Sequence, residues 1–250
     1  GSIIGTGVFV SLGIGISMAG PTVLPAIALA GLVAMCNGLN SAQLAANHPV
    51  SGGTYEYGHR WLNPSLGFVA GWMFLCAKSA SAATAALGFA LYLAPDHQIP
   101  VALGTVALTT SITLTGMQRS NTVNALIVGA VLLALLAFVV LGAPAIGAHP
   151  ERWQTTLQPG QFGQLLPTAA LMFVAFTGYG RIATLGEEVT EPRRTIPRAV
   201  LTTLILSMLL YIGVAWVSLA NAENEIGSLA NLAEEFSGST LGKVMLMAAA

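Results

Sequence analysis

Charged residues are scarce in this chain, and their scarcity is the first guide to its class. Only 8% of the 250 residues are Asp, Glu, Lys or Arg, against about a quarter in soluble domains. The first of them is Glu56, so a long initial segment carries no fixed charge. The net charge is close to zero and no basic run is present, which gives no reason to expect a nucleic-acid partner. The composition predicts an integral membrane protein in contact with the lipid bilayer.

Motifs for catalysis and metal binding are also missing. The two cysteines, Cys36 and Cys76, both fall within apolar runs, and we expect them to be buried free thiols. No phosphate loop is present for ATP-driven transport, and no paired acids or metal set lies within an apolar run, as an intramembrane enzyme would need. We therefore expect no cofactor, no metal and no enzyme activity. The histidines lie in loops without metal-ligand spacing: His48, His59, His97 and His149.

Long apolar runs, by contrast, fill most of the chain. A helix needs about 20 residues to cross a hydrocarbon core of about 30 Å, whereas barrel strands need only about 10 alternating residues. The pattern thus predicts an all-α membrane fold. The first run ends near Ser17, the next six cover about 23–46, 65–93, 99–117, 123–141, 165–186 and 199–219, and a further one begins near Leu241.

Basic residues collect in alternate loops, which predicts the orientation in the membrane. The loops at 47–64, 118–121 and 187–198 carry basic side chains, whereas the opposite loops carry only Arg152 and most of the acidic residues. By the positive-inside rule the first set is cytoplasmic. The acidic segment 221–240 is then an external loop with helical pieces. The cytoplasmic arginines are Arg60, Arg119, Arg193, Arg194 and Arg198.

Glycine-rich segments interrupt two of the apolar runs. One is Gly-Ser-Ile-Ile-Gly-Thr-Gly-Val-Phe-Val at 1–10 and the other is Val-Ala-Phe-Thr-Gly-Tyr-Gly at 174–180, with four uninterrupted runs between them. A broken helix is tolerated in the bilayer only where protein or a polar ligand covers its backbone. Because the period is five spans, the second half would be inverted relative to the first, as in many transporters. We expect one transport domain over 1–250, with repeats at about 1–142 and 164–250.

The first interruption has the chemistry of an anion site. Helix is expected to resume near Val8, which leaves the N–H groups of Gly5, Thr6 and Gly7 at the positive end of a helix. Such an end favours a carboxylate, and the Thr6 hydroxyl adds a donor. Glycines also permit plain close packing of membrane helices, which is the role expected for Gly67 and Gly71.

The second interruption has the opposite chemistry. A helix is expected to end near Phe176, so the carbonyls from Val174 to Thr177 form a negative helix end that suits an ammonium group. Donors at one interruption and acceptors at the other together fit a zwitterionic α-amino acid. Phe176 and Tyr179 are expected to cover this site as gates.

Three stretches of the chain together resemble the amino acid–polyamine–organocation (APC) permease family. They are Ile-Ile-Gly-Thr-Gly-Val-Phe at 3–9, the stretch 49–58 with its continuation at 67–72, and the long stretch 176–199. The similarity extends over nearly the whole chain. It implies a twelve-span, LeuT-like fold with an inverted five-plus-five helix repeat and discontinuous helices 1 and 6. It also implies that the chain runs from mid span one to early span eight.

The resemblance assigns roles to individual positions. The family's carboxylate-binding turn maps to Gly5–Gly7, and its ammonium-binding carbonyls map to Val174 and Thr177. The stretch 49–63 is similar to the family's amphipathic cytoplasmic loop, which would move with alternating access. The implied substrate-binding residues are Ile3, Gly5, Thr6, Gly7, Val174, Phe176, Thr177, Gly178 and Gly180.

Two charged residues within the apolar runs leave alternatives open. Proton-coupled members that resemble this chain carry a lysine in span five, where this chain has Val131. Lys78 lies near the middle of span three, where a charge costs roughly 2.5–3.5 kcal/mol; it either replaces that lysine as the proton-coupling group or stays charged against carbonyls. Arg181 either selects substrates with an acidic side chain or acts as a gate with Glu187 or Glu56, or it extends to the interface. Tyr179, Lys78 and Arg181 are thus the candidates for coupling or gating.

The preferred function is a secondary active amino acid transporter that works by alternating access and is coupled to protons. An exchanger remains an alternative, as does an amine or polyamine carrier, which would need a carboxylate in its site. A non-transporting receptor or scaffold is the alternative from another class. We expect a multi-pass protein of a bacterial-type cytoplasmic membrane, with an amino acid and protons as its small partners.

Overall fold

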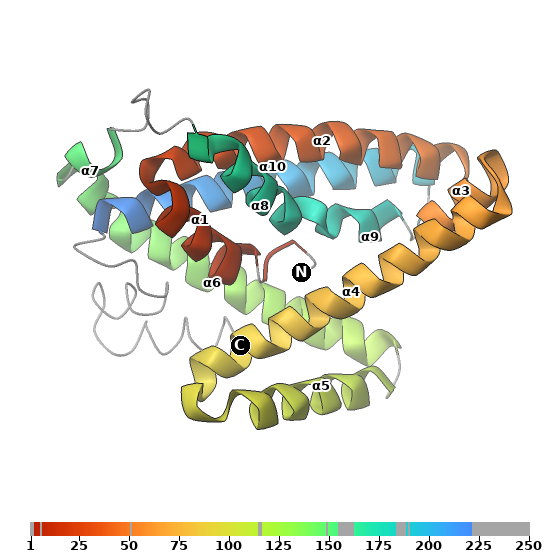
Figure 1. Ribbon diagram of the computed structural model, residues 1–250, viewed down its shortest axis with the longest axis horizontal. Coiled ribbons are helices and arrows are strands. Elements are labelled where there is room, and N and C mark those ends of the chain that lie inside the picture. The colour runs from red at the N-terminus through yellow and green to blue at the C-terminus, as the bar shows by residue number, and fades with distance from the viewer. Residues whose placement is uncertain are drawn as a thin grey trace.

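The computed structural model describes residues 3–5, 7–50, 52–114, 117–148, 150–154, 163–183, 189 and 191–221 (Figure 1). Every element in these ranges is a helix, as predicted. The elements are η1 (Gly7–Ser11), α1 (Leu12–Ala19), η2 (Gly20–Thr22), α2 (Val23–Asn47), α3 (Thr54–Trp61), α4 (Pro64–Leu93), η3 (Pro95–His97), α5 (Gln98–Leu114), α6 (Met117–Ala148), α7 (Glu151–Gln154), α8 (Leu165–Phe176), η6 (Thr177–Tyr179), α9 (Gly180–Ala183) and α10 (Pro192–Asn221).

Four helical runs among the described residues are long and apolar enough to cross a membrane. They are Gly7–Asn47, Pro64–Leu91, Thr122–Ala148 and Pro192–Asn221, and two shorter apolar helices, Gln98–Leu114 and Leu165–Tyr179, accompany them. The chain is an integral, multi-pass membrane protein. Apart from Asn221, the predicted loop 221–240 and the run near Leu241 lie outside the described residues.

Several predicted boundaries are wrong, and one is the end of the span at 123–141, because α6 continues to Ala148. Met117, placed at the end of span four, begins α6, so the expected loop 118–121 is the first turn of that helix. Likewise α10 begins at Pro192, inside the expected loop 187–198. Hydropathy marks only the part of a helix within hydrocarbon, whereas the backbone hydrogen bonds continue into the polar interface.

Local sequence explains where α4 begins. The side chain of Asn63 accepts a hydrogen bond from the Leu66 N–H at 2.8 Å, and Pro64 occupies the first helical position. Asparagine is a favoured N-cap, and proline at the first position loses no intrahelical hydrogen bond. The predicted span 65–93 is therefore confirmed almost to the residue.

The core forms where α10 packs on α2 and α6, and where α2 packs on α8. Glycines let the helices approach: a methyl group on Gly31 would lie 2.6 Å from the Met208 sulfur, and one on Gly38 would lie 3.0 Å from Leu204. α1 lies along α8, as Figure 1 shows. Small residues at such positions are the usual device for close packing of membrane helices, where lipid removes the hydrophobic drive between them.

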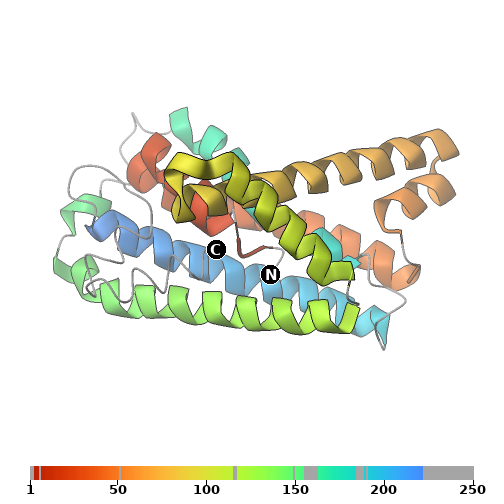
Figure 2. The ribbon, with the colours of Figure 1, turned by 90° about the horizontal axis from the view of Figure 1, so that it is seen from below.

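α3 and α4 form a second packed unit, continued by α5 (Figure 2). A methyl group on Gly67 would lie 2.5 Å from the backbone nitrogen of His59, and one on Gly58 would lie 2.9 Å from the Gly67 Cα. A methyl group on Gly71 would meet the Tyr55 ring at 3.0 Å. The packing role predicted for Gly67 and Gly71 is confirmed, and their partner is α3.

Large apolar side chains remain exposed on the outer faces of α4 and α6, among them Phe68 and Leu133. The prediction that both cysteines are buried is wrong for the same reason. Cys36 on α2 and Cys76 on α4 are exposed. An apolar run in a membrane protein reports contact with lipid as readily as contact with protein, so hydropathy alone does not indicate burial.

Replacing Gly67 with alanine should separate α3 from α4. The added methyl group meets backbone atoms, which cannot turn aside, so we expect a loss of about 1–3 kcal/mol in stability. Gly104→Ala in α5 is the matched control, because its methyl group meets no atom within 4 Å. That change should raise stability by about 0.5–1 kcal/mol through helix propensity. Thermal unfolding of the purified full-length protein measures both, and equal effects would contradict the packing described.

Candidate substrate site at the two helix interruptions

The first interruption ends where η1 begins. The carbonyl of Gly5 accepts hydrogen bonds from the N–H groups of Val8 and Phe9, each at 3.2 Å. These are the first bonds of the helix, so the N–H groups of Gly5 and Gly7 precede the helical ladder. The expected resumption near Val8 agrees with this geometry. Thr6 lies outside the described residues.

A tyrosine from a distant span holds the non-helical segment in place. The Tyr211 hydroxyl donates to the Ile3 carbonyl at 2.6 Å, and both side chains are buried. The Tyr211 ring packs against Phe176, with ring centroids 5.2 Å apart. A methyl group on Gly7 would collide with the Tyr211 hydroxyl. Tyr211 is not among the residues predicted from the sequence; its one signal is a tyrosine inside an apolar span, where a hydroxyl needs a partner.

The second interruption begins at the end of α8. The Val174 carbonyl accepts from the backbone N–H of Thr177 and also from the Thr177 hydroxyl, at 2.8 Å. The Val174 side chain is 63% exposed, whereas Phe176 is fully buried. In the structure α8 ends at Phe176, as expected from the sequence. In this arrangement the hydroxyl of Thr177 occupies the carbonyl that the sequence predicts as an ammonium ligand.

The two interruptions meet in space. A methyl group on Gly7 would lie 2.8 Å from the Ala175 methyl group, and η1 packs on α8. The start of one half-helix is therefore beside the end of another, which sets a positive helix end next to a negative one. At Gly5 and Gly180, by contrast, a methyl group would meet nothing within 4 Å, so the backbone there borders open space.

Tyr179, predicted as a gate, is buried against α2. Its hydroxyl is hydrogen-bonded to the Asn37 side chain, and its ring lies 3.6 Å from the place of a methyl group on Gly38. Gly178 is buried beside it and Gly180 is half-buried. Tyr179 thus ties the second interruption to α2 in the described arrangement.

The charged candidates lie on other elements. Lys78 is half-exposed on α4, and its ammonium nitrogen is 5.5 Å from the centroid of the Phe74 ring, one turn away. Lys78 has no acidic partner among the residues that the structure describes. Arg181 is exposed on α9, and Val131, where the resemblance leads one to expect a lysine, is buried on α6.

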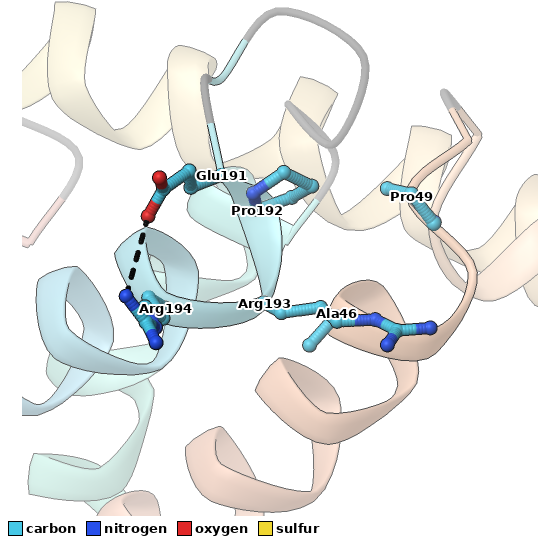
Figure 3. A pocket seen from close by; sticks show the side chains of 6 residues that line it. All are labelled: Ala46, Pro49, Glu191, Pro192, Arg193 and Arg194. Atoms are coloured by element: carbon cyan, nitrogen blue, oxygen red, sulfur yellow. Dashed lines mark ion pairs between the residues drawn. The ribbon is translucent and has the colours of Figure 1, made fainter.

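A hollow of about 470 Å³ opens between the end of α2 and the start of α10. It is lined by Ala46, Pro49 and residues 191–194 (Figure 3). Ala46 lies eight positions beyond Gly38, about 12 Å along the helix, so this hollow is separate from the interruptions. Among the described residues no group of three His, Cys, Asp or Glu side chains could hold a metal ion.

Tyr211→Phe should destabilise the first interruption and leave the packing of the ring unchanged. The ring stays against Phe176, but the buried Ile3 carbonyl loses its donor, which costs about 1–3 kcal/mol. Tyr55→Phe is the control, because the Tyr55 side chain is 44% exposed and its hydroxyl is not buried against a carbonyl. Thermal unfolding of the full-length protein should fall for the first variant only. An equal response of both variants would mean that the hydrogen bond to Ile3 contributes nothing.

Several known transporters are similar to this chain in sequence. An uncharacterized transporter of Mycobacterium tuberculosis is 42% identical over 86% of this chain and 49% of its own length. A branched-chain amino acid permease of Bacillus subtilis is 28% identical over 86% and 51%, and a methylthioribose transporter of the same species is 27% identical over 95% and 57%. The chain spans about half the length of these relatives. The amino acid permease family model matches residues 1–248, and that match implies the APC fold. The chain belongs to the amino acid permease family.

Proposed function

We propose that this chain forms the substrate-binding part of a secondary active transporter that moves amino acids by alternating access. The observation that supports it best is the approach of Gly7 to Ala175, which brings a positive helix end beside a negative one at two interrupted spans. Interrupted helices at corresponding positions of two repeats are typical of substrate sites in secondary transporters. The repeats are assigned to about 1–142 and 164–250 of a single transport domain.

The two helix ends bind different groups of the substrate. The N–H groups of Gly5, Thr6 and Gly7 bind the substrate carboxylate, because the first N–H groups of a helix have no partner within the helix and favour an anion. Carbonyls at Val174 and Thr177 bind the ammonium group, which displaces the Thr177 hydroxyl from the Val174 carbonyl. The site is completed by Ile3, Phe176, Gly178 and Gly180.

Apolar substrate side chains fit this site best. The large buried side chains at the interruptions include Ile3, Phe9, Phe176, Tyr179 and Tyr211, and none of these carries a charge. A cationic amine without a carboxylate would leave the donors at Gly5 and Gly7 unpaired. The name of the branched-chain amino acid permease among the relatives agrees with a neutral, apolar amino acid as substrate.

Lys78 is the proposed proton-coupling group. It takes the place of the lysine that the resemblance implies at the position of Val131, and it is half-exposed on α4 with no acidic partner among the described residues. Amino acid exchange without protons is the alternative. Tyr179 and Arg181 are assigned to gating at the second interruption, with Arg181 exposed on the short helix that follows it.

We place the protein in a bacterial-type cytoplasmic membrane, with α3 and the start of α10 on the cytoplasmic side. The arginines of these segments supply the orientation signal. The transporter has no enzymatic step to perform, because the driving force is a gradient of protons or substrate.

Uptake of labelled amino acids into proteoliposomes tests this proposal on the full-length protein. An imposed pH gradient, a sodium gradient and internal amino acid alone are compared across a panel of substrates. We expect uptake of branched-chain or other apolar amino acids with the pH gradient alone. Uptake only with internal amino acid would replace the symporter by an exchanger, and no uptake of any amino acid would contradict the proposal.

Lys78→Met should separate transport from proton coupling. The variant keeps a long side chain on α4 but carries no proton, so the stimulation by a pH gradient should fall at least about tenfold while substrate exchange continues. Arg198→Gln is the control, because it removes a positive charge from an exposed position of α10. If Lys78→Met kept the full response to the pH gradient, another group would have to carry the proton.

A further inference from the structure

The segment joining α2 to α3 contains two glycines in a backbone region that other residues rarely adopt. Gly52 has φ 124° and Gly53 has φ 53°. The chain leaves α2 after Asn47, turns through these glycines and enters α3 at Thr54. Glycine crosses between backbone regions at low cost, so a change in the direction of α3 is easiest here.

α3 is attached to α4 and not to α2. The backbones of Gly58 and Gly67 approach closely, so α3 and α4 form one packed unit, whereas α2 packs on α10 and α8. Figure 2 shows α3 folded back beside the first turns of α4. The glycine pair therefore lies between two separately packed bodies.

Side chains bridge these two bodies across the glycines. The Nε2 atom of His48, at the end of α2, lies 3.5 Å from the Oε1 atom of Glu56 on α3, with side chains only 15% and 28% exposed. The His48 ring also meets the Trp61 ring edge-on, with centroids 5.5 Å apart. Trp61 in turn stacks on Tyr57 at 5.5 Å. The contact is an ion pair when His48 is protonated, and a neutral imidazole N–H can still donate to the carboxylate.

The described arrangement of α3 leaves one polar group unsatisfied. The Tyr57 hydroxyl is buried and finds no hydrogen-bond partner among the described residues. Burial raises the pKa of Tyr57, so the hydroxyl stays neutral. A buried hydroxyl without a partner opposes the arrangement that buries it, which favours a second position of α3 in which it is hydrated.

Space for such a movement exists beside the segment. The hollow between α2 and α10 is lined by Ala46 and Pro49, on either side of His48 in the sequence. In Figure 3 the Arg193 side chain extends across this hollow toward Ala46, and Arg194 pairs with Glu191 at 3.9 Å. Open volume is thus present beside the end of α2.

We propose that His48, Glu56 and Trp61 form a latch that holds the α3–α4 body to the end of α2, and that this latch opens about Gly52 and Gly53 during transport. The assignment of the opening to transport rests on the proposed function. The latch itself follows from the contacts across the glycines and needs no substrate.

Distance measurements on the full-length protein in lipid nanodiscs test the latch. Spin labels are attached at Gln43→Cys on α2 and Ser65→Cys on α4, both exposed positions, with Cys36 and Cys76 replaced by serine. We expect Glu56→Ala to increase the population with the longer separation about two- to fivefold, the range for a partly exposed ion pair. His48→Ala should act in the same direction, and the double variant should add little to the change made by His48→Ala, because that substitution already removes the partner of Glu56.

Arg194→Ala is the matched control. The substitution breaks the exposed ion pair with Glu191 near the same hollow. Because that ion pair does not join α2 to α3, the distance between the two spin labels should not change. Unchanged separations in both latch variants, or effects that simply add, would overturn the latch. Longer separations with an unchanged initial rate of amino acid uptake would overturn its part in transport. Because the separations are measured without substrate, a failure of amino acid uptake itself is recognised independently.

Discussion

The requirement that every backbone polar group in a bilayer has a partner governs this structure. At the first interruption the Ile3 carbonyl has no helical partner, and the Tyr211 hydroxyl supplies one at 2.6 Å. That hydrogen bond fixes α10 against the non-helical segment, and the same tyrosine packs on Phe176 at the second interruption. One side chain thus contacts both interruptions, and the first N–H groups of a helix, which have no partner within the helix, are the donors that we propose for a ligand.

Glycines allow the helices to approach one another as closely as this site requires. Gly7 brings η1 against Ala175 and Tyr211, Gly38 admits Tyr179 and Leu204 to α2, and Gly67 joins α4 to α3. In lipid, close approach of backbones replaces the hydrophobic drive that packs soluble helices. This close packing produces two units, one of α2 with α8 and α10, and one of α3 with α4. The contact between these units at the end of α2 depends on a few polar and aromatic side chains.

Much of the fold follows from local sequence, because span length and charge are local properties. α2 and α4 begin and end where the apolar runs predict, and the helix breaks fall at the glycine-rich segments. Hydropathy gives neither the early start of α6 at Met117 nor the exposure of Cys36 and Cys76, since it does not distinguish lipid from protein neighbours. The contact of Tyr211 with Ile3 joins residues 208 positions apart, and no local pattern contains it. The pairing of His48 with Glu56 likewise depends on how α3 folds back on α4.

Competition with substrate analogues tests the central claim, that paired helix ends bind both charges of a zwitterion. Uptake of a labelled apolar amino acid by the full-length protein is measured against the unlabelled amino acid, its amide, which lacks the carboxylate, and the corresponding carboxylic acid, which lacks the ammonium group. We expect the intact amino acid to compete at least about a hundredfold more effectively than either analogue, because each analogue lacks the charge that one helix end binds. Equal competition by the amide would contradict it, since the helix start at Gly5 to Gly7 would then have no carboxylate to bind.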